Sequence, residues 1–517
     1  MRCEWLFLFL SGCAAFVEGE DEKHAVDPNL VGPHDGGSGD AALPVSDAAF
    51  GTDAPPPCDP LLLPSVNPCV IADGIFVSQS IGILGGLGTQ LQPTSSIAEG
   101  LALAKAKGKR LYVCAETYVE QVTILEGVSM FGFFACSGGA WKVSASRALV
   151  TSTSRTGVRA ITINKSTRVE GFSFVSPNAT APAESSFGLV AINAPGLSLV
   201  NVTVRAGDGS SGVAGGDAPA VTSAGSIDGS KFVAWRTCSG TSLCPGLSGD
   251  AGASACKVNG SVAPPSQQGV TGGLGAMSTK LTCEIAIPAG FTCKAVEPSR
   301  TGSSGVRVGA GGTVGATAKA GPDGAPGASG SSGASVGIFS ADGYAPSNGA
   351  AGANGEPGGG GGGGGPSDTA GGASTGTYFS DSGAGGGAGG CSGSGGGAGG
   401  GGGASVAVML FDSPIAMESC DFIAGHGGDG ASGGASSAGT AGGKGGEGWG
   451  PSGLGGGGSG GSGGNGGKGG AGGGGSSIAL AVRGAVPKQT AVSLLPGLGG
   501  ISATATGLAT GFYAIPW

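Results

Sequence analysis

Apolar and polar positions alternate in short runs over residues 159–209, and the runs recur after thirty residues. Such β-branched runs with a period of two, bounded by Gly, Pro, Asn and Ser, predict strands. A sequence period of about 20 to 50 residues is typical of a solenoid, in which each unit buries its apolar face against its neighbours. The matching positions are Val169 with Leu199, Phe172 with Val202, and Phe174 with Val204.

The same pattern returns 218 residues further along the chain. Residues 406–411 and 478–482 add two more apolar runs of strand length. The block 210–403 is therefore predicted to loop out from one coil, and 425–476 to loop out from the equivalent corner of the next, because stacked repeats touch only their neighbours. The corresponding positions are Leu197 and Ile415, Leu199 and Met417, Val202 and Cys420, Val204 and Phe422, and Gly207 and Gly425.

A short helix is predicted ahead of the ladder. Ser96, followed three residues later by Glu99, has the signature of a capping box. Ile97 and Leu101 then lie on one face of a helical turn. Because an open sheet edge invites pairing with other chains, this helix is expected to cover the first coil. The aromatic C-terminal segment, 512–517, is expected to cover the last one.

The order of elements resembles the start of right-handed parallel β-helices. The segments that carry the resemblance are Gly-Ile-Phe-Val-Ser at 74–78, the helix, Leu-Tyr-Val-Cys at 111–114, Thr-Tyr-Val-Glu at 117–120 and Gly-Val-Ser-Met-Phe-Gly at 127–132. They look like pectate-lyase-like bacterial surface lipoproteins, although Phe133 replaces the second Gly of that pattern. The resemblance spans 74–235. It implies an all-β fold, a right-handed parallel β-helix with a short N-terminal capping helix and long Gly-rich insertions.

Glycine dominates the insertions, and the chain holds 117 of them. A Gly-Gly-x period of three occurs at 442–448 and again at 463–471. This period matches the three residues per turn of a polyproline-II-like helix and would place x on one face, leaving bare backbone for close lateral packing. The segments resemble the Gly-rich repeats of PGRS proteins and polyglycine bundles. The alternative is plain disorder, and the sequence leaves both open.

The N-terminus predicts export. A charged start is followed by the apolar run 6–10 and then by Ser-Gly-Cys, the pattern of a secretory signal. Leu-Ser-Gly-Cys at 10–13 resembles the bacterial lipobox, which implies that Cys13 is acylated and anchors the chain to a membrane. Ala14 replaces the Asp typical of inner-membrane retention, so the outer-membrane surface of a bacterial cell envelope is expected. The alternatives are an ordinary signal peptide cleaved nearby and a secreted protein.

Charge is concentrated near this end. The net charge of the chain is −9, and residues 18–59 hold ten acids and one base, which gives −9 in that stretch alone. Together with the Pro content, this predicts that 13–72 is a disordered tether. The rest of the chain forms no basic stripe, so nucleic acid is not an expected partner. No apolar run reaches 18 residues, so no transmembrane helix is predicted.

The 13 cysteines suggest disulfides and no metal site. Cys114 and Cys136 are 22 residues apart, about one coil, which favours a bond between adjacent coils in an oxidising compartment. Two separate buried thiols are the alternative. Cys58 and Cys69 are expected to close a small loop. The other spacings are irregular and only three His occur, so neither a zinc site nor any other cofactor is predicted.

Candidate catalytic groups are sparse. Arg168 and Glu170 share a strand face and predict a solvated ion pair, and His426 lies in a Gly-rich corner without a nucleophile elbow. We therefore expect a non-catalytic structural or adhesive surface protein of unknown ligand, with a surface polysaccharide or protein as its partner. The alternative is a polysaccharide lyase or hydrolase on the same scaffold, with clustered carboxylates.

In the domain organisation expected from these patterns, segments of β-helix alternate with insertions. The domains are a signal with lipobox (1–12), the tether (13–72), β-helix (73–235), a Cys-containing insertion (236–300), a Gly-rich insertion (301–403), a β-helix coil (404–424), a second Gly-rich insertion (425–476), and a terminal coil and cap (477–517).

Overall fold

The computed structural model describes residues 63–516, except 65, 67, 233–235, 238–242, 245–247, 278–279, 287–289, 296–301, 303–306, 314, 368–375, 380 and 450–453. The chain divides into two compact units, 1–57 and 58–517, and the structure below is that of the second. The expected lipid attachment at Cys13, the acidic tether up to residue 62 and the loop cysteine Cys58 lie outside the described residues.

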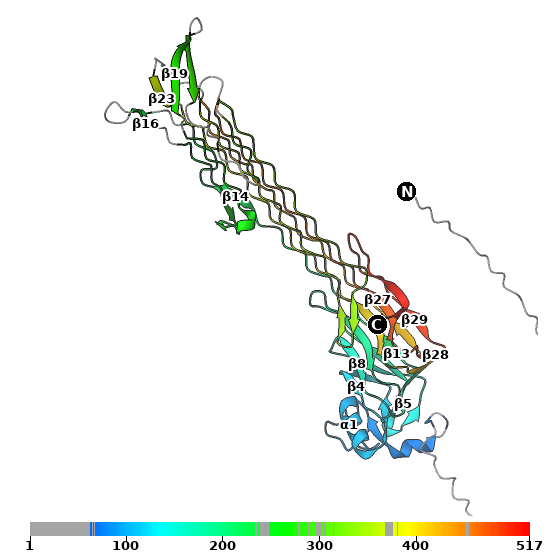
Figure 1. Ribbon diagram of the computed structural model, residues 1–517. Helices are drawn as coiled ribbons and strands as arrows, with labels where there is room; N and C mark the ends of the chain where they lie inside the picture. The colour runs from blue at the N-terminus through cyan, green and yellow to red at the C-terminus, as the bar shows by residue number, and fades with distance from the viewer. Residues whose placement is uncertain are drawn as a thin grey trace, which may run out of the picture. The chain divides into compact units, whose positions relative to one another are not determined.

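Almost all of the regular secondary structure in the second unit is strand, and its three largest sheets run parallel apart from the short β5–β6 pair (Figure 1), which confirms an all-β fold. Sheet A contains β1 (Gly74–Val77), β2 (Arg110–Cys114), β5 (Met130–Ala135), β9 (Thr167–Glu170), β12 (Leu197–Val200), β25 (Ala416–Glu418) and β28 (Lys488–Thr490), and β6 (Lys142–Val143) pairs with β5. Sheet B contains β3 (Thr117–Val119), β7 (Ala148–Thr151), β10 (Phe172–Val175), β13 (Thr203–Arg205), β26 (Asp421–Ile423) and β29 (Ser493–Leu495). Sheet C contains β4 (Val122–Ile124), β8 (Thr156–Ile161), β11 (Ser186–Ile192), β24 (Ser405–Phe411), β27 (Ser477–Arg483) and β30 (Ala509–Ala514).

From β2 onward the chain visits the sheets in the order A, B, C and then begins the next coil. We call these three sheets the three-sheet stack. Two of the three predicted thirty-residue registers are confirmed. β9 pairs with β12 so that Val169 faces Leu199, and β10 pairs with β13 so that Phe174 faces Val204. The 218-residue offset holds as well, since Leu199 pairs with Met417 and Val204 with Phe422.

The core of the stack lies between the inner faces of the sheets. Alternate residues of each strand point inward, so Val169, Leu199 and Met417 are almost fully buried. Phe172 and Phe174 stack with ring centroids 5.3 Å apart. Burying one such side chain stabilises the fold by about 1.5–3 kcal/mol, and the aligned coils repeat this contribution along the stack.

Helix α1 (Ile97–Lys107) packs against β1, β2 and β4 at the N-terminal end of the stack. Ser96 caps it by accepting the N–H of Ala98. The expected reciprocal bond from Glu99 is not made. Glu99 instead accepts the N–H of Gly85 at 3.4 Å, and the carboxylate of Glu120 accepts the N–H groups of Ile97 and Ala98 at 2.8 and 3.0 Å. Glu120, from the next coil, caps the helix in place of Glu99 because the fold brings its carboxylate to the N-terminal end, where the helix dipole is positive.

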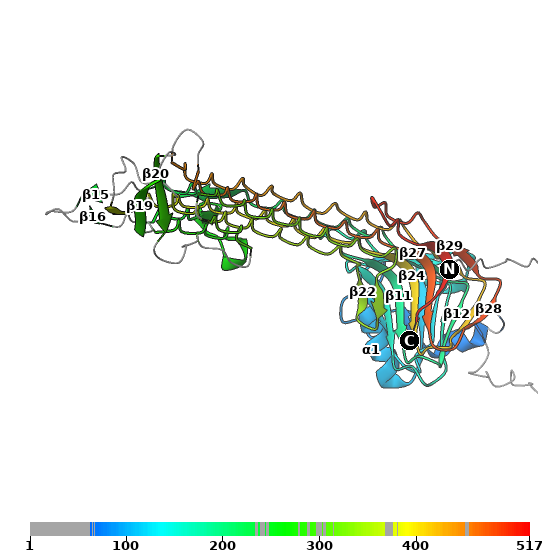
Figure 2. The same ribbon diagram turned by 45° about the horizontal axis from the view of Figure 1, so that its top comes forward.

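At the other end, the last strands are β28, β29 and β30. The C-terminal segment that was expected to cover the last coil forms β30, which extends sheet C beside β27. Before the first insertion the stack ends at Arg205 of β13, and residues 207–230 already belong to the glycine-rich part. The chain leaves the stack at one corner only, after sheet B, and returns to sheet C (Figure 2).

The glycine-rich insertions pack into a hydrogen-bonded bundle. We define the glycine bundle as 207–230, 249–254, 267–277, 318–334, 347–366, 383–403, 425–449 and 454–476. Its central segment, 383–403, is almost entirely buried and contains only Gly, Ala, Ser and Cys. Bonds to a given neighbour recur every third residue, so the segment presents three faces.

Each face of the central segment donates to one neighbour and accepts from another. Gly397 donates to Gly216 and accepts from Gly434, Gly393 donates to Gly464 and accepts from Gly355, and Gly386 donates to Gly273 and accepts from Gly252, all at 2.8–2.9 Å. The six neighbours also bond to one another around the ring. A Cβ does not fit at Gly390, because one added there would lie 1.9 Å from the carbonyl oxygen of Thr440.

Small elements interrupt the bundle. They are β14 (Val221–Ala224) with β17 (Ala255–Val258) and β18 (Ser261–Val262); β15 (Arg236–Thr237) with β16 (Leu243–Cys244); β19 (Lys280–Ala286) with β20 (Gly290–Ala295) and β23 (Gly376–Phe379); and β21 (Ile338–Ser340) with β22 (Gly343–Ala345). Three 3-10 turns complete the described elements, at Pro68–Asp73, Ser137–Gly139 and Pro265–Gln267.

Candidate functional site

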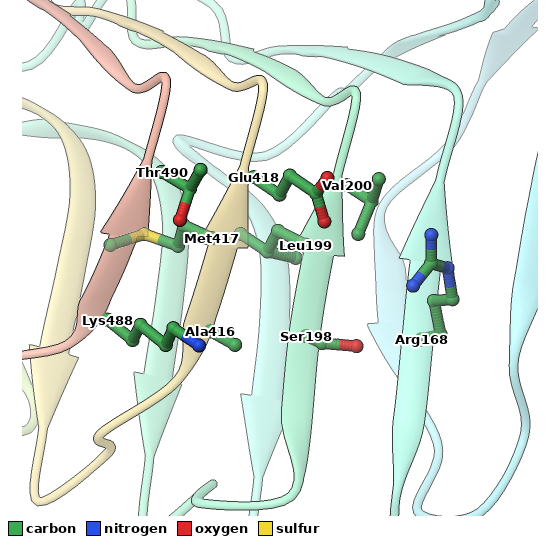
Figure 3. Close-up of a pocket in the computed structure, with 9 residues that line it drawn as sticks. All are labelled: Arg168, Ser198, Leu199, Val200, Ala416, Met417, Glu418, Lys488 and Thr490. Carbon is green, nitrogen blue, oxygen red and sulfur yellow. The ribbon is translucent and has the colours of Figure 1, made fainter. Parts of the chain in front are cut away.

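The outer face of sheet A carries two rows of side chains from successive coils (Figure 3). Parallel pairing in register places equivalent residues about 4.8 Å apart, so each row runs along the stack. The first row is Arg168, Ser198, Ala416 and Lys488, and the second is Glu170, Val200, Glu418 and Thr490. All of these residues except Glu170 line a shallow hollow of about 130 Å³.

The charged side chains of the two rows differ in whether they are paired with another residue. Arg168 and Glu170 form an ion pair, Nε to Oε2, at 2.6 Å, and their side chains are only 27% and 12% exposed. Glu418 and Lys488 are exposed, and neither charged group makes an ion pair or hydrogen bond within the described residues. Their side chains extend over the neighbouring strands, Glu418 over β12 and Lys488 over β25 (Figure 3). The hollow therefore offers one acid and one base to a ligand.

The sequence pointed to only two of the four charged residues in these two rows on the outer face of sheet A. Arg168 and Glu170 were picked out by their period of two, and the structure brings them together as expected. Glu418 and Lys488 were missed, although the repeat could have revealed them. The 218-residue offset places Glu418 beside Val200, and the next coil adds 72 residues between Ala416 and Lys488.

The other ladder carboxylates serve the fold. Glu116 accepts the N–H of Gln79 at 2.6 Å and so ties the segment after β1 to the next coil. Glu120 caps α1, as described above. Glu126 accepts the N–H groups of Asn164 and Lys165 at 3.1 and 3.2 Å, and these bonds, with that of Asn164 foremost, lower the pKa of its carboxyl. Each of these acids bridges two coils.

A second hollow of about 540 Å³ lies on the glycine bundle beside β14. Its lining includes two acids and three hydroxyls: Asp228, Asp250, Ser226, Ser230 and Ser254. Asp228 accepts the N–H of Lys444 at 2.7 Å, and Ser230 accepts the N–H of Asp250 at 2.6 Å. Much of this polar lining is thus already used to hold neighbouring segments together.

Disulfides join distant parts of the described chain. Cys114 bonds to Cys136, the pair that the 22-residue spacing singled out, and links the first two coils of sheet A. Cys256 bonds to Cys391 and ties the β14–β17–β18 sheet to the central segment. The sequence did not reveal this second pair, because 135 residues separate its members. Cys420 is buried with a free thiol, and the side chain of Cys69 is not described.

The remaining candidate features are a histidine, metal-binding clusters and membrane-spanning helices, and each is considered within the described residues. His426 accepts the N–H of Leu498 through Nδ1 at 2.9 Å, so its ring ties the bundle segment 425–449 to the chain that follows β29. The described residues contain no cluster of three or more His, Cys, Asp or Glu that could hold a metal ion. No helix among them has the length and apolar character needed to cross a membrane. Neither a protein-family model, nor a curated protein, nor a solved structure matches this chain.

Proposed function

We propose that this is an exported, lipid-anchored, non-catalytic surface protein with a structural or adhesive role. The three-sheet stack is inferred to be a right-handed parallel β-helix, similar to that of pectate-lyase-like surface lipoproteins. The glycine bundle is inferred to be a polyglycine-II-like assembly with PGRS-like repeats. Acylated Cys13 would hold the protein at the outer-membrane surface.

The observation that carries this proposal is the buried central segment. Its 21 residues, at about 3.1 Å each, span about 65 Å. It has six neighbours, and its N–H and C=O groups bond to all of them. Few side chains capable of chemistry project from it, so its useful properties are length and stiffness. A stiff spacer of this kind suits a protein that must reach from one surface toward another.

The two disulfides support export. Such bonds persist in oxidising compartments and are rare in a reducing cytosol. Both lie where they fasten separate pieces of chain, Cys114–Cys136 between coils and Cys256–Cys391 between a small sheet and the bundle. The location is tested by growing cells with an alkyne-bearing fatty acid. We expect the parent chain to carry the label and Cys13→Ala to lose it. A labelled Cys13→Ala chain would contradict the lipid anchor.

The hollow of sheet A is the proposed ligand-binding face. Its rows continue from coil to coil, which suits an extended polymer lying along the stack. Exposed Glu418 and Lys488 can hydrogen-bond the hydroxyl, carboxyl or amino groups of a polysaccharide or a partner protein. Because the hollow is shallow, binding would need several such contacts along the rows.

One observation favours the alternative, a polysaccharide hydrolase. Glu170 and Glu418 both flank Val200, so their Cα atoms are two strand spacings apart, about 10 Å. Inverting glycosidases separate their carboxyl groups by roughly 6.5–9.5 Å. The ion pair with Arg168 opposes this role, because it commits the Glu170 carboxylate.

A polysaccharide panel, incubated with the purified protein with and without Ca²⁺, separates the two functions. Retention without new reducing or unsaturated ends supports adhesion, and we expect Lys488→Met and Glu418→Gln to weaken it. Glu447→Gln, which changes an exposed acid paired with Lys231 in the bundle, is the matched control. Product release that disappears in both Glu170→Gln and Glu418→Gln would establish the hydrolase instead.

A further inference from the structure

The segment between β1 and α1 exposes a group of aliphatic side chains. We call residues 79–93 the apolar loop, and the sequence contains no charged residue within it. Monomeric proteins seldom expose several large apolar side chains so close together without a partner. The exposed fractions are 43% for Ile81, 57% for Ile83, 81% for Leu84, 60% for Leu87 and 93% for Leu91.

The apolar loop is held in place by its backbone. Ile83 donates its N–H to the carbonyl of Pro93 at 3.0 Å, and Gly88 donates to Gln92 at 3.0 Å. The carbonyl of Gly88 in turn accepts the N–H of Phe76 from β1 at 3.1 Å. These bonds fix the turn that bears the leucines, so their exposure is a property of the folded state.

A basic side chain, that of Lys107, stands beside the leucines. Lys107, in the last turn of α1, donates its ammonium group to the carbonyl of Leu87 at 3.3 Å. Lys105, two residues earlier and so on another face of the helix, donates to the carbonyl of Glu126, and both lysines are exposed. The carboxylates of Glu99 and Glu116 accept backbone N–H groups in the middle and at the start of the loop, from Gly85 and Gln79. Exposed aliphatic groups beside the ammonium group of Lys107 match a bilayer surface, where acyl chains lie beneath phosphate headgroups.

The same end of the molecule receives the chain from its N-terminal side. Leu63, the first described residue, packs against an aromatic cluster that includes Phe76 and Trp141. The Nε1 group of Trp141 donates to the carbonyl of Gln90 in the apolar loop at 3.4 Å. The chain from Cys13 to this point holds about 50 residues and could span up to roughly 165 Å if fully extended. An anchor at Cys13 alone would therefore leave the height of the stack above a membrane unfixed.

We propose that the apolar loop inserts its aliphatic side chains into the interface of a bilayer, with Lys107 at the headgroups. This inference rests on the proposed membrane anchorage. It adds a second contact that sets how the stack meets the membrane. The occupant is a lipid surface because the loop has no charged residue of its own, bears exposed aliphatic side chains with the ammonium group of Lys107 beside Leu87, and lies where the anchored segment joins the folded unit.

The test uses the full-length lipidated chain in vesicles of phosphatidylethanolamine and phosphatidylglycerol that contain brominated lipid. Leu91→Trp reports contact at the loop. Leu498→Trp is the control, because Leu498 is 71% exposed and follows β29, in the last coil of the stack. After the fluorescence of the parent's own tryptophans is subtracted, we expect the brominated lipid to quench the tryptophan at 91 strongly and the one at 498 not at all. Equal quenching of the two, or none at 91, would overturn the proposal.

A triple variant separates the loop from the anchor. Leu84→Ser, Leu87→Ser and Leu91→Ser change exposed side chains, so circular dichroism should be unchanged. If the parent carries no fatty-acid label, the anchor proposal fails. The loop proposal is then tested by flotation alone: the parent should float with these vesicles and the triple variant should not. If the labelled parent floats and the tryptophan at 91 is unquenched, the loop proposal alone fails. If the parent forms a dimer, the triple variant does not, and the tryptophan at 91 is unquenched, the loop binds a second copy of the chain and the membrane proposal is overturned.

Discussion

Acidic side chains set the register between parallel glycine segments. Asp208 and Asp217 accept, through Oδ1, the N–H groups of His426 and Ala435, each at 2.7–2.8 Å. In each case the residue after the Asp donates its own N–H to the carbonyl of that same partner. This two-bond clasp recurs at Asp228, Asp323 and Asp429. Glycine alone would allow the segments to slide by three residues, and the clasps oppose that shift.

Removing one clasp should loosen the bundle locally. Asp217→Ala deletes the acceptor for the N–H of Ala435, and we expect a loss of about 1 kcal/mol in the free energy of unfolding. Hydrogen exchange of the Ala435 amide should become faster. Asp217→Asn keeps an acceptor oxygen and should preserve most of the protection. Equal protection in the Ala variant and the parent would show that the clasp contributes nothing.

A single methyl group tests the packing of the central segment. In Gly390→Ala, the new Cβ would lie 1.9 Å from the carbonyl oxygen of Thr440, so neighbouring segments must move apart at a cost of about 1–3 kcal/mol. Gly216→Ala is the matched control, because a Cβ there meets nothing within 4 Å. Denaturant unfolding should separate the two variants clearly. If both unfold at the same midpoint, the bundle is looser than its hydrogen bonds imply.

Glu184 gives the molecule a pH-dependent contact. Burial alone would raise the pKa of its carboxyl, but the N–H groups of Thr180 and Ala181 and the guanidinium of Arg155 outweigh that effect and lower the pKa. A lowered folded-state pKa adds stability above the unfolded value of about 4.3, and this contribution is lost as pH falls through the folded pKa. Relative to Glu184→Gln, the parent should be more stable at pH 7. The difference in unfolding free energy should shrink below about pH 4, and a constant difference would contradict this.

At the scale of the element, the stack depends on its inward rows. Phe172 is fully buried and stacked on Phe174, so Phe172→Asp buries an unpaired charge and should cost at least about 4 kcal/mol. Ser173→Asp places the same charge one residue along, on the outer face, and should change stability little. Circular dichroism during urea titration gives both values. Similar midpoints for the two variants would mean that the inward and outward faces are wrongly assigned.

The sequence predicted the elements that carry side-chain patterns. The thirty-residue repeat gave the Val169–Leu199 register, and the 218-residue repeat carried it across the insertion to Met417. The bundle was only partly predictable, because 15 of the 21 residues of the central segment are Gly and its six Ala, Ser and Cys residues are spread over all three positions of a three-residue period. Glu120 at the N-terminus of α1 and the Cys256–Cys391 bond were not predictable either. Both join residues that only the folded coils and segments bring together.

At the scale of the whole folded unit, the stack and the bundle should be separable. Gly209 lies against Gly403, where a Cβ at Gly209 would be 2.1 Å from the carbonyl oxygen of Gly403, so excising 210–403 brings two adjacent ends together. We expect the excised chain to keep the strand signal of the stack, because β11 still pairs with β24. Its stability should fall, since β21 and β22 no longer cover sheet C.

In the excised chain, protease cleavage of the second insertion shows whether the rest of the bundle stays folded. Residues 425–476 lose the central segment on which they pack, and we expect limited proteolysis to cut them while the intact chain resists. Protection of 425–476 in the excised chain would show that these two segments are stable as a pair. Loss of the strand signal as well would show that the stack needs the bundle.

The three-residue period also constrains how such a chain can change in length during evolution. One turn of a segment is three residues and about 9 Å, so an insertion of one or two residues would rotate every later face away from its partner. The central segment bonds to six others, and lengthening it usefully requires matching turns in its neighbours. Homologous chains with longer or shorter bundles should therefore differ by multiples of nine nucleotides, gained or lost in several segments together.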